Sequence, residues 1–319
     1  LSGGGARAAY QVGVLKAVSE ILSQSSQITS PFQIICGTSA GAINAAKLAT
    51  EVDNFAESVN SLYQIWSTIT SQDVHRSGYG ELLKSTSVLF GSFFHRGRSG
   101  ARPLSLFDNK PLLQLLKKNI KMERLSQMID SKMLHALCIS ASGYSSGQNI
   151  SFFQGDASLT PWKSALKLGV KTELNHNHLL ASSALPAIFP AVRINREYFG
   201  DGALRQTAPL SSALNLGADK LFVIGVSGNA KLTDDRITTN DSPTLAKIMS
   251  QLFNSAFIDA LEEDIGLIKR FNNFISFLSE QQQRSMKVRP VQLLVIEPTI
   301  KFDVVANDNI YCLPKSLRW

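Results

Sequence analysis

The stretch "IICGTSAGAINAA", residues 34–46, places a G-x-S-x-G pattern between a short apolar run and a helical run. The apolar run predicts a buried strand, and residues 40–49 predict a helix. A strand that passes directly into a helix puts Ser39 on a sharp bend with its hydroxyl oxygen exposed, and Gly37 and Gly41 relieve steric conflict there. The alternative interpretation is a plain glycine-rich turn in which Ser39 caps the helix.

Strand-sized apolar runs alternate with helical patterns along the rest of the chain. The patterns predict helices at 8–24, 40–49, 55–69, 109–120, 176–186 and 242–279, and strands at 32–36, 134–142, 149–154, 196–203, 220–227 and 291–298. Short apolar strands between helices are typical of an α/β fold with a mainly parallel sheet covered on both faces. No internal repeat or Pro/Gly linker divides the sequence, so we expect one α/β domain over residues 1–319, with a basic helical insertion at 73–121.

The first residues, "LSGGGAR", predict the end of a strand, a glycine turn and the start of a helix. Leu1 and Ser2 are interpreted as the last residues of a strand whose first part is missing. Glycines let the backbone turn sharply and bring bare N–H groups to a ligand, and a helix beginning there adds the positive end of its dipole. The turn is therefore expected to hold an anion. A dinucleotide is not the expected anion, because that site needs an acidic residue after the second strand, where this sequence has Thr38 and Ser39.

A nucleophilic serine needs a base, and the five histidines do not supply one in the usual order. None lies within the last 141 residues, so the α/β-hydrolase order of serine, acid and histidine finds no acid–histidine pair near the C-terminus. Asp201, followed by Gly202 after a predicted strand, could instead accept the Ser39 proton directly. The other interpretation of Asp201 is a turn residue that caps local N–H groups.

An acyl transfer to Ser39 would pass through a tetrahedral oxyanion, which preorganised N–H donors stabilise. The glycine turn and the start of the helix after Ser39 are the predicted sources of these donors. The predicted oxyanion-hole residues are Gly3, Gly4, Gly5 and Ala40 as N–H donors, with Arg7 as a nearby positive charge.

The net charge of +7 is concentrated in one segment. From His75 to Lys121 the sequence has nine Lys or Arg against two acidic residues, so the remaining residues balance. Basic residues beside the aromatic run "SVLFGSFF" at 87–94 suit an anionic membrane surface, and a solvated basic loop with buried anchors is an equally consistent interpretation. No nucleic-acid motif accompanies the charge, so no nucleic-acid partner is expected. We predict that residues 73–121 cover or flank the mouth of the Ser39 cleft as a lid or membrane-docking segment.

The cysteines, and the absence of metal-binding motifs from the sequence, indicate neither a metalloprotein nor a disulfide scaffold. Cys36, Cys138 and Cys312 are few and lie in apolar contexts, so they are predicted to be buried free thiols. Neither a zinc-ligand spacing nor a calcium-loop motif is present, so no metal and no cofactor are expected. The longest apolar runs are too short to cross a bilayer. The expected location is the cytoplasm or a peripheral membrane surface, and export stays open because the start of the first strand is missing. The oligomeric state is not predicted.

Three separated pieces, "GGGAR", "GTSAG" and "DGA", together with "ASSALPAIFPAV" at 181–192, resemble the patatin-like phospholipase family from residue 1 to about 226. The resemblance implies a three-layer α/β/α sandwich, a glycine-rich oxyanion hole, Ser39 as nucleophile and Asp201 as base. It further implies a lipid acyl hydrolase acting on a phospholipid or lysophospholipid at a membrane surface. An acyltransferase or thioesterase that uses the same acyl-enzyme, and a non-catalytic lipid-binding module, stay open as alternatives.

Overall fold

The computed structural model describes residues 1–24, 29–74, 105–164, 167–204, 210–226, 242, 245–286, 288–300, 302 and 305. Side chains are described in these ranges except at residue 71 and residues 245–260. Most of the basic segment, residues 75–104, lies outside the described residues, and so does Cys312. Within the described residues, no helix is both long and apolar enough to span a bilayer.

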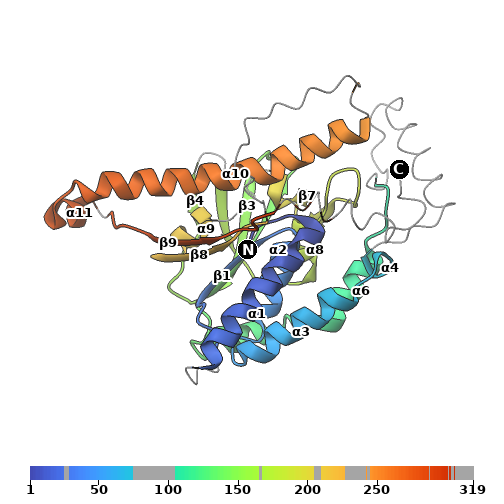
Figure 1. The fold of residues 1–319 in the computed structure, drawn as a ribbon, viewed down its shortest axis with the longest axis horizontal. Coiled ribbons are helices and arrows are strands. Elements are labelled where there is room, and N and C mark those ends of the chain that lie inside the picture. The colour runs from blue at the N-terminus through green and yellow to red at the C-terminus, as the bar shows by residue number, and fades with distance from the viewer. Residues whose placement is uncertain are drawn as a thin grey trace.

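The helices are α1 (Ala9–Ser23), α2 (Ala40–Ala49), α3 (Phe55–Thr68), α4 (Ser71–Val74), α6 (Lys110–Asn119), α7 (Arg124–Asp130), α8 (His176–Ser182), α9 (Leu210–Asn215), α10 (Leu245–Ser276) and α11 (Glu280–Met286), with 3-10 turns η1 (Gly5–Ala8) and η2 (Gly202–Leu204). The strands are β1 (Ile34–Thr38), β2 (Ala136–Gly143), β3 (Asn149–Gly155), β4 (Trp162–Lys163), β5 (Lys167–Lys171), β6 (Val192–Ile194), β7 (Glu197–Asp201), β8 (Lys220–Ile224) and β9 (Gln292–Ile296). Figure 1 shows α1, α2 and α3 on one side of the strands and α10 running along the other.

The main sheet has the strand order β4-β5-β3-β2-β7-β6, and β1 also pairs with β2. Because β3 covers one edge of β2 along nearly its whole length, β1 and β7 share the opposite edge. β1 runs parallel to β2 and reaches Ser140 with Thr38, whereas β7 runs antiparallel and pairs its last residue, Asp201, with Ala141. The ends of β1 and β7 therefore meet at adjacent positions on one edge of β2.

The α/β class is confirmed, but the sheet is mixed and not mainly parallel. Among the described residues, three strand pairings are parallel and four are antiparallel. Three of the four antiparallel pairs join consecutive strands, as between β2 and β3 and between β6 and β7, whereas β2 and β7 are distant in sequence. The hairpin predicted at 134–154 is one of these pairs.

The alternation of side chains along the strands builds a core on each face of the sheet. Leu137 and Ile139 of β2 face the helical layer of α1, α2, α3, α6, α7 and α8. Ala136 and Cys138 face the other side, where they pack with Phe153 and Leu216. The two faces together give the three-layer arrangement that the family resemblance implied.

A second small sheet, in which β8 and β9 pair in parallel, is joined to the main sheet through the first two residues. The Leu1 nitrogen donates to the Cys36 carbonyl at 2.9 Å and the Thr38 nitrogen donates to the Leu1 carbonyl at 3.3 Å, which is a parallel ladder with β1. The Ser2 nitrogen donates to the Ile224 carbonyl of β8 at 3.4 Å. Leu1 and Ser2 thus bridge β1 and β8, in agreement with their interpretation as strand residues.

Two helices differ from the sequence prediction. The helix expected over 176–186 ends at Ser182, because Pro186 cannot continue a helix and Ala187 has a positive φ of 63°. The helix predicted over 242–279 is α10, which extends from Leu245 to Ser276 and packs Leu261, Ile265 and Ile268 against β8. The thiols of Cys36 and Cys138 are free as predicted, although Cys36 is only partly buried.

Candidate active site

Ser39 occupies a tight bend between β1 and α2. Its backbone has φ 55° and ψ −130°, a left-handed conformation that non-glycine residues rarely adopt. A Cβ on Gly37 would lie 2.6 Å from the Ala42 Cα, and one on Gly41 would lie 2.6 Å from the Leu1 carbonyl oxygen. Both glycines are therefore required by close backbone packing around the bend. The bend joins a strand directly to a helix, which is the local geometry that the G-x-S-x-G pattern predicts.

Ser39 and Asp201 are in direct contact. The Ser39 hydroxyl donates to Asp201 Oδ2 at 2.6 Å, although the two residues are 162 positions apart in the sequence. The other carboxyl oxygen, Oδ1, accepts from the Ala203 backbone nitrogen at 2.8 Å. Asp201 has no exposed surface and Ser39 is 4% exposed. Both carboxyl oxygens are thus held by donors inside the protein, and one of those donors is the candidate nucleophile.

The environment of Asp201 changes the pKa of its carboxyl group. Burial raises the pKa of Asp201 from its usual value near 3.8 to about 7, and hydrogen bonds from Ser39 and Ala203 act in the opposite direction. Burial dominates because the carboxylate loses its hydration. The Asp201 carboxyl is therefore a stronger base than an exposed aspartate.

The glycine turn lies against this pair. A Cβ on Gly3 would lie 3.2 Å from Ser39 Cβ and 2.9 Å from Ala203 Cβ, so the Gly3 backbone packs against both neighbours. Gly5 turns the chain with a φ of 58°, and the Arg7 nitrogen donates to the Gly4 carbonyl at 3.2 Å to close the turn.

The predicted oxyanion-hole residues separate into two groups. Gly3 and Ala40 adjoin Ser39, and Gly5 lines the cavity that Ser39 also lines. Gly3, Gly4 and Arg7 are not among the described residues that line this cavity. Gly4 packs instead against Val226, which follows β8.

An apolar cavity of about 370 Å³ opens at Ser39. Its walls come from three helices: Ile43 on α2, Ile65 and Trp66 on α3, and Leu112 and Leu116 on α6. The α6 residues belong to the described part of the basic segment. Lys47 is the one cationic side chain among the described lining residues, and its Nζ pairs with Glu51 at 2.5 Å. The cavity has the size and the apolar lining of a small-molecule site.

The last residue of α8 and the loop that follows it hold both members of the pair, a role that the sequence analysis did not assign. Ser182 Oγ accepts from the Ser39 backbone nitrogen at 2.9 Å and donates to the Ser140 carbonyl at 2.7 Å. The Ala184 carbonyl accepts from the Asp201 backbone nitrogen at 2.8 Å. The stretch "ASSALPAIFPAV", one of the four pieces that carry the family resemblance, was the available signal, but its sequence alone does not predict these bonds.

Two of the three described histidines, both on α8, make other contacts. His178 is buried, its Nδ1 accepts from the Asn175 nitrogen at 3.1 Å, and its ring meets Phe152 edge-on. Burial lowers the pKa of His178 to about 4, so the ring is neutral near pH 7. His176 bonds the Ile120 carbonyl. Within the described part of the chain, no group of three or more His, Cys, Asp or Glu side chains is placed to hold a metal ion.

Comparison with known proteins gives this arrangement a family. Residues 1–214 match the family model described as patatin-like phospholipase. The chain is 29% identical over 215 residues to a protein of Pseudomonas aeruginosa named cGAMP-activated phospholipase, and the match covers 66% of this chain and 53% of that protein. The chain thus spans about half the length of this curated relative. Since the family model covers well over half of the 319 residues, the chain belongs to the patatin-like phospholipase family, as its motifs predict.

Proposed function

We propose that this chain is a serine lipid acyl hydrolase of the phospholipase A or lysophospholipase type, with Ser39 as nucleophile and Asp201 as base. One observation carries the proposal. Ser39 lines an apolar cavity, and its Oγ donates to the buried Asp201 carboxyl at 2.6 Å. The bond supplies an activated hydroxyl, and the cavity supplies a site for a hydrocarbon chain.

The first step uses the contact between the two side chains. Asp201 takes the proton of Ser39 Oγ as that oxygen attacks an ester carbonyl, and a covalent acyl-serine forms when the alcohol leaves with the proton from Asp201. Asp201 then deprotonates a water molecule that attacks the acyl-serine, and it returns that proton to Ser39 Oγ as the bond to the fatty acid breaks. The raised pKa of Asp201 supports this role, because a base is most effective when its pKa lies near the working pH.

The negative charge that develops on the carbonyl oxygen needs hydrogen-bond donors to stabilise it. The N–H of Ala40 at the start of α2 and the backbone of Gly3 beside Ser39 are the best-placed candidates among the predicted residues. The helix start adds its positive dipole end. Arg7 lies farther along the same turn, so we assign it to the support of the turn.

The cavity supports a lipid as the substrate. Ile43, Trp66 and Leu116 offer an apolar surface to an acyl chain whose carbonyl sits at Ser39. Burial of the chain contributes about 0.8 kcal/mol per methylene group. The family description names a phospholipase, and we propose phospholipids or lysophospholipids, which carry the same acyl ester, as the substrate class.

The test is fatty-acid release from a panel of phospholipids and lysophospholipids, with products identified by mass spectrometry. Ser39→Ala and Asp201→Asn should each abolish release, and the double variant should lose little more because the two groups act as a unit. Ser67→Ala and Asp130→Asn, which change the same residue types on the exposed surface, are matched controls and should retain activity.

Labelling by a fluorophosphonate separates the alternatives. A hydrolase or an acyltransferase should be labelled at Ser39, whereas a non-catalytic lipid-binding module should not. Products formed with added alcohol acceptors distinguish transfer from hydrolysis. Lipid hydrolysis that survives in Ser39→Ala would contradict the proposed function.

A further inference from the structure

The outer side of the last turns of α10 is unusually apolar. Four large side chains are exposed there, at spacings of three or four residues that keep them on one side of the helix: Leu267 (60% exposed), Phe271 (47%), Phe274 (55%) and, just after the helix, Phe277 (86%). The opposite side of α10, with Ile265, Ile268 and Ile275, is buried. We call the four exposed residues the α10 outer face.

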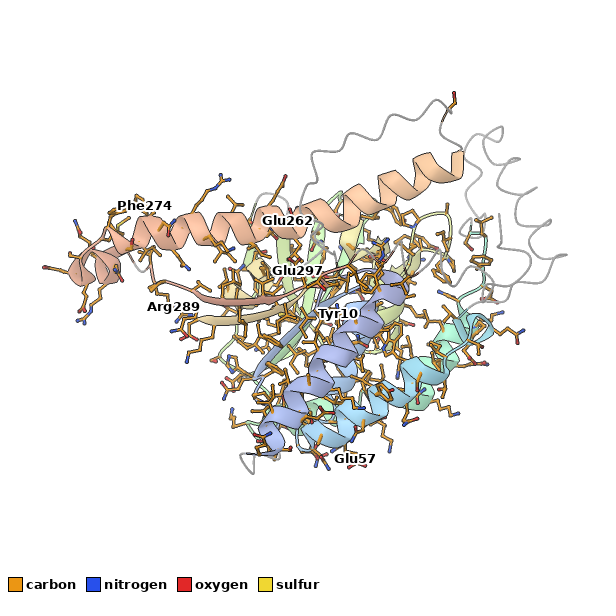
Figure 2. The ribbon with its side chains drawn as sticks, viewed as in Figure 1. Tyr10, Glu57, Glu262, Phe274, Arg289 and Glu297 are labelled. Atoms are coloured by element: carbon orange, nitrogen blue, oxygen red, sulfur yellow. The ribbon has the colours of Figure 1, made fainter. Side chains whose placement is uncertain are left out.

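This face projects from the body of the protein. Figure 1 shows α10 continuing past the ends of β8 and β9 to α11 at one extremity of the molecule. Figure 2 shows Phe274 on the side of α10 away from these strands. β8 and β9 pack against the inner side of α10. Among the described residues, no apolar side chains cover the outer face.

Positive charge gathers toward the α11 end of this face. From Lys269 to Arg289 the sequence has five basic residues and one acidic residue, Glu280, whereas Glu262, Glu263 and Asp264 lie about one turn before Leu267. Of the basic residues, Arg284 pairs with Glu280 at 3.5 Å, and Arg289 donates to the Gly217 carbonyl on the strand side of α10. Lys269 and Arg270 are exposed immediately before Phe271. This group is separate from the basic segment at 73–121.

We propose that the α10 outer face docks on an anionic lipid bilayer. Phenylalanine rings entering the boundary between headgroups and acyl chains, with Lys and Arg against anionic headgroups, are the features of an interfacial helix. A second copy of the chain is the alternative occupant, and the experiment below distinguishes it from a bilayer. The inference does not depend on the proposed hydrolysis, although a bilayer is where the substrate of a phospholipase is found.

Vesicle sedimentation tests the proposal. The full chain is mixed with vesicles of phosphatidylcholine alone and with vesicles that contain phosphatidylserine, at low and high salt. Wild type should bind the anionic vesicles about tenfold more tightly than the neutral ones, and high salt should reduce this difference. Lys269→Glu with Arg270→Glu, and separately Phe274→Ser with Phe277→Ser, should each weaken binding to the anionic vesicles about tenfold.

Matched controls make the same chemical changes elsewhere. Ile21→Ser removes another exposed apolar side chain, and Lys163→Glu with Arg196→Glu reverses two other exposed charges. Both should leave vesicle binding unchanged. Turnover of a short soluble ester should also be unchanged in the α10 variants, so failure of docking is distinguishable from failure of the proposed catalysis. Thermal unfolding reports folding, and the charge variant carries the test if the serine variant is unfolded.

Three results would overturn the proposal. One is wild-type protein that does not bind anionic vesicles. Another is binding that both α10 variants retain, which would assign docking to another surface such as residues 73–121. The third is a wild-type dimer that Phe274→Ser with Phe277→Ser converts to monomer without loss of vesicle binding, which would make the face a contact between copies.

Discussion

Burial and hydrogen bonding act in opposite directions on the Asp201 carboxyl. Burial raises its pKa to about 7, whereas the hydrogen bonds from the Ser39 hydroxyl and the Ala203 nitrogen lower it. A carboxyl with a pKa near 7 accepts a proton more readily than an exposed aspartate and is ionised at pH 8. In the proposed mechanism, burial gives the aspartate the basicity that a histidine has in other serine hydrolases. A second charged partner at Asp201 would remove this property.

The first prediction concerns catalysis and pH. Only the ionised Asp201 can accept the Ser39 proton, so kcat/KM should fall about tenfold per pH unit below pH ~7 and be constant above it. The measurement is the initial rate with a short uncharged ester from pH 5 to pH 9. A profile whose midpoint lies near pH 4 would show that burial does not raise the pKa of the base.

The second prediction concerns stability and pH. The pKa of Asp201 is higher in the folded state than in the unfolded state, so its ionisation favours unfolding. The stabilisation that comes from the higher pKa of Asp201 in the folded state is fully present below pH ~4, where the carboxyl is protonated, and is lost as pH rises towards 7. It amounts to about 1.4 kcal/mol for each unit by which the folded-state pKa exceeds the unfolded-state pKa. Asp201→Asn does not titrate. The free energy of unfolding of Asp201→Asn, relative to wild type, should therefore increase between pH 4.5 and pH 8 in urea unfolding. Asp130→Asn, at an exposed position, is the control and should show no such increase.

At the scale of elements, the sequence predicts the strand–helix unit around Ser39 better than it predicts β6 and β7, the strand pair that places Asp201 beside Ser39. A fully apolar run followed by G-x-S-x-G defines β1, the bend and α2 by local rules. β6 and β7 have three and five residues and pair antiparallel, and their direction depends on loop lengths that periodicity does not report. The mixed sheet was missed for this reason. The bonds of Ser182 and Ala184 to the pair were missed because they join segments that are distant in sequence.

The third prediction belongs to α2, whose inner side forms one wall of the cavity. Ile43→Trp should fill part of the 370 Å³, so turnover of long-chain esters should fall at least about tenfold while turnover of an acetate ester is kept. Rates with an acyl series from two to sixteen carbons (roughly the range of natural chains) measure this. Tyr63→Trp adds similar bulk on the exposed side of α3 and is the control. Equal loss for short and long esters would show that the cavity does not hold the acyl chain, and Ile43→Phe repeats the test with less overpacking.

At the scale of the whole molecule, positive charge is unevenly distributed. Nine basic and two acidic residues lie between His75 and Lys121, which accounts for the net charge of +7. The described end of this segment, α6, lines the cavity at Ser39 through Leu112 and Leu116. The residues just before α6 also contact the loop after α8, because the Leu106 nitrogen donates to the Ala187 carbonyl at 2.8 Å. The basic segment is therefore attached at the cavity, whereas the α10 outer face lies on a different layer.

The fourth prediction follows from this attachment. If the basic segment at 73–121 draws the cavity to an anionic bilayer, reversing Arg96, Arg98 and Arg102 to Glu should weaken hydrolysis of lipid in anionic vesicles. Each basic residue near such a surface contributes about 1 kcal/mol, so the three reversals should lower vesicle binding at least about a hundredfold at low salt and much less at high salt. Turnover of a short soluble ester should hardly change, because the reversals leave Ser39 and Asp201 in place. Parallel loss of both activities would instead mean that the segment supports the folded site, and unchanged vesicle binding would exclude it as a docking surface.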